Sequence, residues 1–167
     1  MQMITQASSA HYGDIIRIYN QAVIAGSQTA DEKTVSLKEK LSWLKQHTGK
    51  HYIIYVASID VKIVGYLALS PYRYGRSAFV KTAEISYYVD NNNQGKGIGN
   101  QLIQHAINQC PELKIESLIA ILLSCNSVSI AILKKFNFEQ WGAMPGIAKL
   151  KNGSVDHLYY GKHLTLI

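Results

Sequence analysis

The sequence predicts a mixed α/β or α+β fold, in which helices cover both faces of one sheet. Three observations support this prediction. Apolar residues recur at helical spacing in some segments and in alternating or continuous runs in others, and the two kinds of segment are interspersed. The chain shows no linker, repeat or low-complexity stretch. One apolar run leads through a glycine-rich turn into a helical pattern, which is the order of a strand followed by a helix.

Caps and apolar periodicity define the elements of the N-terminal half. Ser8 or Ser9 can cap the first helix. The second helix carries leucines and Trp43 at helical spacing. Two apolar or alternating runs then read as strands that form a hairpin across Asp60. The expected elements are a strand at 4–6, a helix from the first cap to about residue 24, a helix at 36–46, and strands at 52–59 and 62–70.

The C-terminal half continues with a polar, aromatic loop and then alternates strands with helices. The very apolar run at 116–125 indicates a central strand. The last part of the chain reads as two strands around Lys151, Asn152 and Gly153. The expected elements are a loop at 71–77, a strand at 82–89, a helix at 101–107, a strand at 116–125, a helix at 127–136, and two strands within 138–164.

Size and composition are those of one globular domain, which we expect to span residues 1–167. No apolar run approaches the ~20 residues of a membrane helix, and the N-terminus lacks the pattern of a signal peptide, so we expect a cytoplasmic protein without a membrane partner. Cys110 and Cys125 are expected to be reduced thiols without metal-ligand spacing, and we predict no metal site. The net charge is +6, and the lysines and arginines are scattered along the chain. The scatter argues against a nucleic-acid partner, and the positive charge suits an anionic cofactor.

The segment at 90–100 is the most informative part of the chain. It joins the apolar run at 85–89 to a helical pattern, so backbone N–H groups at a helix N-terminus would be exposed to a phosphate or pyrophosphate. Lys96 is followed by Gly97, where a P-loop requires Ser or Thr, and Asn100 stands where the dinucleotide fingerprint requires Gly or Ala. A loop that uses glycine only to turn is the alternative.

The spacing that fits is Gln-x-x-Gly-x-Gly, formed by Gln94, Gly97 and Gly99. It resembles the acetyl-coenzyme A pyrophosphate loop of the Gcn5-related N-acetyltransferases (GNAT). A second segment, from Asn126 to Ser129, resembles the Asn-x-x-Ser/Ala segment of that family, although Asn126 could also be a plain helix cap. The element order agrees with the same fold over the whole chain.

This resemblance implies a GNAT fold with a mostly antiparallel central sheet, and an acetyltransferase that uses acetyl-coenzyme A (acetyl-CoA) as cosubstrate without a metal. The backbone near Tyr88 and Val89 would hold the pantetheine and the thioester carbonyl. The residues that the resemblance assigns to the cofactor are Tyr87, Tyr88, Val89, Gln94, Gly95, Lys96, Gly97, Ile98, Gly99, Asn126 and Ser129.

Within this superfamily, the chain is most similar to the phosphinothricin and methionine sulfone acetyltransferase branch. The similarity implies a small amino-acid-like acceptor bound by Arg73, Arg76 and Phe79, and a homodimer as a possible assembly. Two positions depart from the branch: Phe79 stands where Tyr is common, and Ser154-Val155-Asp156 replaces a Trp-x-Asp segment. The similar residues are 18–23, Ser27, Thr29, Trp43, Arg73, Arg76, Ala78 and Glu84.

Glu84 is the candidate general base. Strand alternation places it on one face with Ser86 and Tyr88, and a carboxylate within a buried strand is costly unless it is paired or used. A structural pairing with Arg73 or Arg76 is the alternative. Many related transferases carry a tyrosine as general acid where this chain has Leu133. Water, another tyrosine or the departure of an unprotonated thiolate must serve instead.

Three functions compete at this point. The first is acetylation of the amino group of a small molecule such as phosphinothricin, methionine sulfone or methionine sulfoximine, for which Arg73 and Arg76 supply fixed cations. The second is acetylation of a protein N-terminus or a lysine, which would require an open peptide groove. The third is coenzyme A binding without catalysis, which would not require Glu84.

Overall fold

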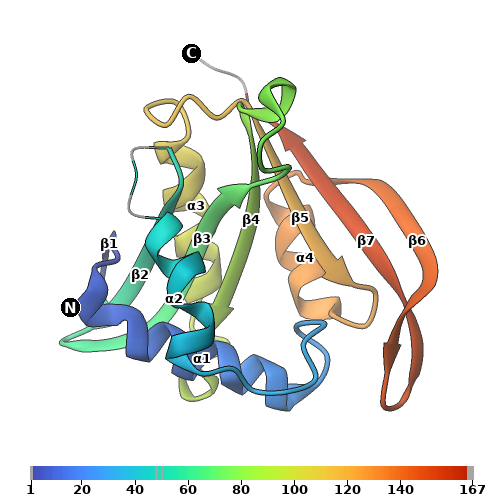
Figure 1. Ribbon diagram of the computed structural model, residues 1–167, viewed down its shortest axis with the longest axis horizontal. Helices are drawn as coiled ribbons and strands as arrows, with labels where there is room; N and C mark the ends of the chain where they lie inside the picture. The colour runs from blue at the N-terminus through green and yellow to red at the C-terminus, as the bar shows by residue number, and fades with distance from the viewer. Residues whose placement is uncertain (1, 48, 50, 165–167) are drawn as a thin grey trace.

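The computed structural model describes residues 2–47, 49 and 51–164, which form a seven-stranded sheet in the order β1-β2-β3-β4-β5-β7-β6 (Figure 1). Neighbouring strands are antiparallel except β4 and β5, which are parallel. The mixed, mostly antiparallel sheet of the predicted fold class is thereby confirmed. The strands are β1 (Gln2–Gln6), β2 (Ile53–Ile59), β3 (Lys62–Pro71), β4 (Thr82–Val89), β5 (Ser117–Leu123), β6 (Glu139–Leu150) and β7 (Gly153–His163).

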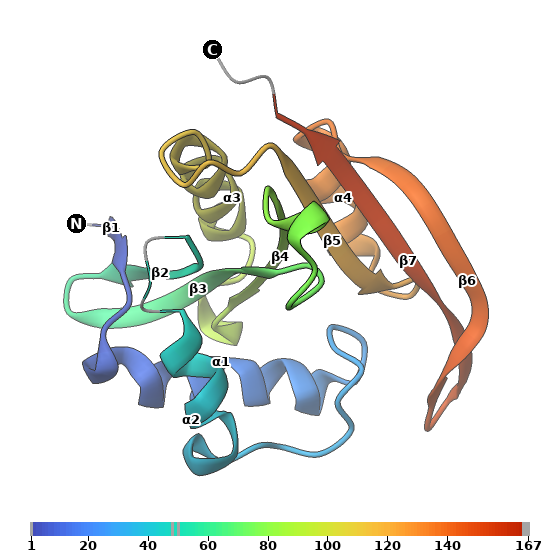
Figure 2. The same ribbon diagram turned by 45° about the horizontal axis from the view of Figure 1, so that its top comes forward.

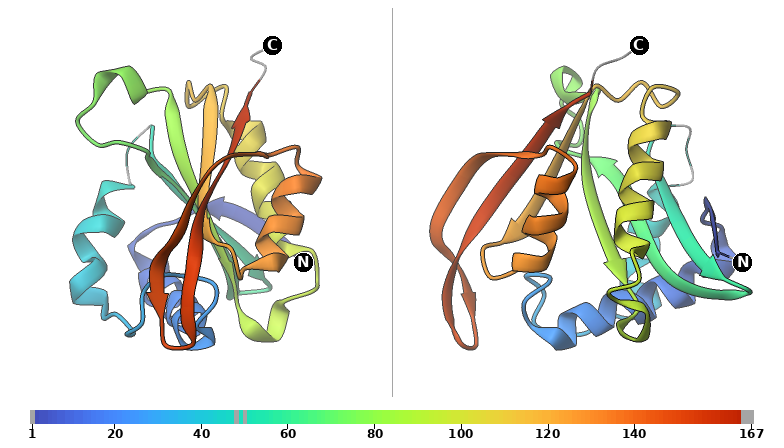
Figure 3. Two further views of the ribbon diagram at one scale, coloured as in Figure 1. Left: turned by 90° about the vertical axis from the view of Figure 1, so that its right-hand side faces the viewer. Right: turned by 180° about the vertical axis from the view of Figure 1, so that it is seen from behind.

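Helices cover both faces of the sheet, as Figure 3 shows in its left view. The helices α1 (Tyr12–Ala25) and α2 (Leu37–Gln46) pack on one face and enclose a buried cluster with β2 and β3. The helices α3 (Ile98–Gln109) and α4 (Ser127–Lys135) cover the other face over a larger cluster. Within the described residues, none of the helices has the length and apolar character that crossing a lipid bilayer demands.

The parallel pair β4 and β5 separates soon after it begins. Residues Thr82 to Glu84 pair with Ser117 to Ile119, and no later residue of β4 pairs with β5. Both strands nevertheless continue, β4 to Val89 and β5 to Leu123. Since β5 instead follows β7 along its whole length, the sheet is split between β4 and β5 toward their C-terminal ends.

The last two strands form a long hairpin that projects beyond the rest of the sheet (Figure 2). The register between β6 and β7 shifts twice, between Gln140 and Gly142 and between Met144 and Ala148. The ring of Trp141 lies so close to Gly161 that a Cβ there would overlap it. Glycine at position 161 therefore allows the tryptophan to pack flat on β7.

The expected elements are all present, with shifted boundaries. The first helix begins as a 3₁₀ turn, η1 (Ser9–His11), and becomes α-helical at Tyr12. The helix after the glycine turn starts at Ile98 rather than at residue 101, because Gly97 is its N-cap. Two further 3₁₀ turns, η2 (Ser77–Phe79) and η3 (Asn91–Asn93), were not expected.

Candidate active site

The segment before α3 turns twice through left-handed backbone. Gly95 and Gly97 have φ angles of +75° and +80°, which L side chains rarely adopt. A Cβ on either glycine would meet no described atom within 4 Å, so the turn faces open space. The first N–H groups of α3 have no partner within the helix, and the helix dipole makes this end positive. This cradle fits a pyrophosphate group.

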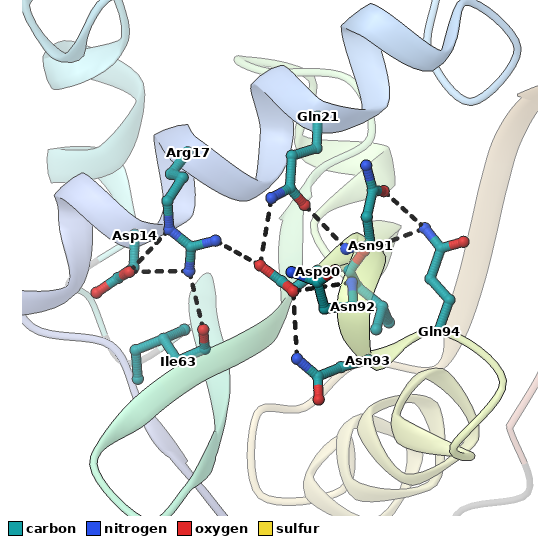
Figure 4. A network of polar contacts seen from close by, with 10 residues as sticks. Asp14, Arg17, Gln21, Ile63, Asp90, Asn91, Asn92, Asn93 and Gln94 are labelled. Carbon is teal, nitrogen blue, oxygen red and sulfur yellow. Dashed lines mark hydrogen bonds and ion pairs between the residues drawn. The ribbon is translucent and has the colours of Figure 1, made fainter.

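A buried carboxylate anchors this loop to α1 (Figure 4). Asp90 directly follows β4 and is 1% exposed. Its Oδ2 accepts hydrogen bonds from Arg17 and from Gln21 (3.2 Å), and its Oδ1 accepts from the Asn92 backbone (3.1 Å) and the Asn93 side chain (3.2 Å). Burial opposes the ionisation of Asp90, but the Arg17 hydrogen bond and the other three outweigh it and lower its pKa. The ionised carboxylate thus holds the loop against α1.

A cavity of about 390 Å³ lies between the loop and the start of α4. Lys96 does not line it, because its Nζ donates to the Asn92 carbonyl (2.9 Å) and to Asn93 Oδ1 (3.1 Å) and so folds back on its own loop. The assignment of the other residues to acetyl-CoA stays a prediction, but the structure brings them to one wall. The predicted cofactor residues that line the cavity are Tyr87, Tyr88, Val89, Gln94, Gly95, Gly97, Ile98, Gly99, Asn126 and Ser129.

Asn126 acts as a helix cap and still faces this cavity. Its Oδ1 accepts a hydrogen bond from the Ser129 backbone (3.2 Å) at the N-terminus of α4. Among the described residues, the Asn126 Nδ2 and the Ser129 hydroxyl have no hydrogen-bond partner. Both groups are therefore available to a ligand in the cavity, in addition to the structural role of the cap.

A second cavity, of about 360 Å³, lies on the face that α1 and α2 cover. Glu84, Ser86 and Tyr88 line it from β4. Burial raises the pKa of Glu84. Within the described part of the chain, its side chain has neither an ion pair nor a hydrogen bond, so the expected alternative of a pairing with Arg73 or Arg76 is not seen. An unpaired, partly buried carboxylate beside a cavity is compatible with a general base, and that role of Glu84 stays a prediction.

The gap between β4 and β5 shares lining residues with both cavities. A small cavity of about 50 Å³ lies in this gap, lined by residues of both strands and by Leu133 of α4. Tyr88 and Gln28 line all three cavities. Two molecules bound on opposite faces of the sheet could therefore meet through the gap.

The predicted acceptor residues lie elsewhere. Arg73, Arg76 and Phe79 are exposed in the loop around η2, and none is among the described residues that line the 360 Å³ cavity. Phe79 packs edge-to-face against Tyr72, with ring centroids 5.5 Å apart. Figures 1 and 3 show this loop (green) at the end of the sheet where β4 begins, away from the connection between α1 and α2. Their contact with an acceptor stays a prediction.

Several residues of the site were not found from the sequence. Gln28, Lys40 and His157 line the 360 Å³ cavity, and they come from the loop after α1, from α2 and from β7. No spacing rule connects them, because only the order of the strands brings them together. Asp90 alone carried a usable signal: an acidic residue that ends an apolar strand and precedes a run of asparagines is typical of a cap.

The described residues contain no group of three or more His, Cys, Asp or Glu side chains that could hold a metal ion. The two cysteines are free, and Cys110 is buried while Cys125 is exposed. Burial raises the pKa of the Cys110 thiol to about 12.

Comparison with known proteins places this geometry in a family. The sequence model of the acetyltransferase (GNAT) family matches residues 15–138. The chain is 32% identical over 149 residues to the L-methionine sulfoximine/L-methionine sulfone acetyltransferase of Pseudomonas aeruginosa, covering 87% of this chain and 85% of that protein.

Solved structures agree. A phosphinothricin acetyltransferase from Sinorhizobium meliloti in complex with AcCoA has a TM-score of 0.91 at 27% identity, covering 98% of this chain and 88% of that one. An N-acetyltransferase from Staphylococcus aureus Mu50 has a TM-score of 0.92 at 27% identity, covering 99% of both chains. The protein therefore belongs to the acetyltransferase (GNAT) family and is an N-acetyltransferase of that type.

Proposed function

We propose that this protein transfers the acetyl group of acetyl-CoA to the amino group of a small amino-acid-like acceptor, such as phosphinothricin, methionine sulfone or methionine sulfoximine. The observation that carries the proposal is the pair of cavities on opposite faces of the sheet, which meet between β4 and β5 with Glu84 on one side. The names of the relatives, which specify these acceptors or AcCoA, support it.

In this proposal the pyrophosphate of acetyl-CoA lies at the N-terminus of α3, and the pantetheine follows the unpaired part of β4 into the gap. The acceptor occupies the cavity beneath α1 and α2. Glu84 takes a proton from the acceptor's ammonium group, directly or through water. The free amine attacks the thioester carbonyl carbon, and its nitrogen loses a second proton to water as the amide forms. The C–S bond breaks, and its electron pair leaves with the sulfur. Holding the two reactants in the gap supplies the proximity that direct transfer requires.

The acceptor cavity suits a small molecule with a polar head. Lys40 lines it, with its Nζ 3.7 Å from an oxygen of Asp31 and 5.2 Å from the centre of the Tyr19 ring. Arg76 belongs to the loop that leads directly into the strand of Glu84, so one short segment carries both an anion-binding side chain and the base. We propose Arg76 as the anchor of the acceptor's anionic head, although it does not line the cavity; Lys40, which does, is the alternative anchor.

The test is a steady-state assay with acetyl-CoA and a panel of free amino acids, methionine sulfone, methionine sulfoximine, phosphinothricin and peptides. Glu84→Gln should lower turnover by roughly 10²–10⁴-fold with little change in acetyl-CoA affinity. Glu139→Gln, which removes an exposed carboxylate outside the cavities, is the matched control. Acetylation of peptides alone would favour the peptide-modifying alternative, and coenzyme A binding without any turnover would favour a non-catalytic module.

Two measurements separate a base from a structural carboxylate: the pH dependence of kcat/KM in the unaltered protein, and the stability of Glu84→Gln. Because burial raises the Glu84 pKa, kcat/KM should rise with pH through that raised value as the base ionises. A raised pKa in the folded state also means that stability from Glu84 is present below its unfolded pKa and is lost as pH rises through the folded one. Glu84→Gln should therefore not destabilise the fold at neutral pH, whereas loss of a structural ion pair would.

A further inference from the structure

Gln28 is a residue that all three cavities share. It lines the 360 Å³ cavity proposed for the acceptor (the acceptor cavity), the 390 Å³ cavity proposed for acetyl-CoA (the cofactor groove) and the small cavity in the gap between β4 and β5. Tyr88 is the other described residue common to all three, and its hydroxyl lies beside the Thr29 side chain. The Gln28 amide, in contrast, makes no hydrogen bond with any described residue.

The backbone around Gln28 is held in place. Helix α1 ends at Gly26, whose left-handed conformation (φ +73°) turns the chain toward the gap. The Ser27 carbonyl accepts a contact from Cys125 Sγ at 3.8 Å, and Thr29 Oγ1 is hydrogen-bonded to the Tyr19 hydroxyl (3.0 Å). Gln28 therefore sits between two tethered residues, and its position does not depend on its own side chain.

Several other side chains that line the gap carry donors and compete with Gln28 for a leaving sulfur. On the α4 side the gap is lined by Leu133, which is 1% exposed and has no proton to give, and by Ser129 and Asn126. The last two also line the 390 Å³ cavity, where they are proposed to contact the pantetheine or phosphate of the cofactor. The Tyr87 hydroxyl donates to the Ser129 carbonyl (3.5 Å), and burial raises the pKa of both Tyr87 and Tyr88 to about 12. Ser86 is the remaining hydroxyl that lines both the acceptor cavity and the gap.

We propose that the Gln28 amide donates a hydrogen bond to the sulfur of coenzyme A and stabilises the thiolate as the C–S bond breaks. This inference rests on the proposed function, because it requires coenzyme A in the groove. When the amine nitrogen bonds to the carbonyl carbon, the C–S electron pair passes to the sulfur. The Gln28 amide does not transfer a proton: one ammonium proton goes to Glu84, the nitrogen loses its second proton to water as the product amide forms, and the thiolate takes a proton from water afterwards.

The direct test is the pKa of the thiol in the complex of the protein with coenzyme A, followed by the ultraviolet absorbance of the thiolate. S-methyl-coenzyme A, which has no thiol, gives the background from the protein. Gln28→Met keeps the length of the side chain and removes its donors, so the thiol pKa should rise by about one unit, a tenfold loss in thiolate at a given pH. Gln28→Glu should raise it further, because a carboxylate repels the thiolate.

Two comparison variants complete the experiment. Gln46→Met changes an exposed glutamine at the end of α2 and should leave the thiol pKa unchanged. Ser86→Ala removes the competing hydroxyl, and a rise in thiol pKa there but not in Gln28→Met would overturn the proposal in favour of Ser86. An unchanged thiol pKa in Gln28→Met, with a raised KM for the acceptor, would overturn it in favour of an acceptor contact.

The outcome for Gln28 is separable from that of the proposed function. If calorimetry shows that the unaltered protein does not bind coenzyme A, the proposed function fails, and the assignment of Gln28 with it. If coenzyme A binds and the Gln28 variants leave its thiol pKa unchanged, the Gln28 proposal alone is wrong. Should Gln28→Met not fold, the same readout is obtained from Gln28→Glu, which has a charged side chain, and from Gln28→Ala, which has a smaller one.

Discussion

Replacing Asp90 by asparagine should destabilise the protein strongly, although the two side chains have nearly the same shape. Each carboxylate oxygen of Asp90 accepts two hydrogen bonds, one pair from Arg17 and Gln21 and the other from Asn92 and Asn93. An amide has only one acceptor oxygen. In either orientation, its NH₂ group must face two donors, so two hydrogen bonds and the charge of the ion pair are lost.

The size of the effect follows from these contacts. A hydrogen bond to a charged group contributes about 1.5–3 kcal/mol, and breaking a buried ion pair costs about 3–5 kcal/mol. Arg17 is 37% exposed and keeps Asp14 and the Ile63 carbonyl as partners, which places the expected loss near the lower end, about 3 kcal/mol. For a chain of this size, that corresponds to a fall in Tm of about 6–12 °C.

Thermal and urea unfolding of Asp90→Asn would measure this loss, with Asp14→Asn as the matched control. Asp14 contacts the same arginine but is 41% exposed, so its substitution should cost no more than about 1 kcal/mol. The lowered pKa of Asp90 means that its contribution is present above the unfolded value of about 3.9 and is lost as pH falls through the folded one. Equal effects of the two substitutions at neutral pH would refute the reasoning.

Two further predictions concern ligand binding. Gly97→Ala forces a side chain into left-handed backbone at the N-cap of α3, at a cost of about 1–2 kcal/mol. The affinity for acetyl-CoA, measured by calorimetry, should therefore fall about tenfold. Unchanged affinity in a folded variant would show that the pyrophosphate does not bind at this loop. Arg76→Ala should raise the KM of the acceptor and leave that of acetyl-CoA nearly unaltered. If Lys40→Ala produces that selective effect and Arg76→Ala does not, the anchor is the lysine that already lines the cavity.

Local signals in the sequence were sufficient for the secondary structure and for one wall of the site. The apolar runs and helical repeats predicted every strand and α-helix, and the glycine spacing predicted the turn before α3. Boundaries moved where a single residue decides them: Gly97 starts α3 earlier because a left-handed glycine can cap a helix. The 3₁₀ turns were missed because such short elements have no periodicity to detect.

The acceptor side could not be read in the same way. Its wall depends on the pairing of β5 with β7, the last strand in the chain, which draws β5 away from β4 and opens the gap. Lys40 and His157 are separated by most of the sequence, and nothing in their local context indicates that they share a cavity. Arg73 and Arg76 were assigned by resemblance, and the structure places them in an exposed loop.

The separation of β4 from β5 also bears on how such an enzyme could change its acceptor. In the proposed assignment, the cofactor groove is built by the end of β4, the glycine turn and the start of α4, whereas the acceptor cavity is built by α1, α2, the connection between them, β3, β4, the end of β5 and β7. Among the described lining residues, only Gln28 and Tyr88 belong to both. If the proposed assignment holds, substitutions at acceptor-cavity residues other than these two and Glu84 can accumulate without touching the acetyl donor, which leaves one half of the reaction free to diversify while the other half stays fixed.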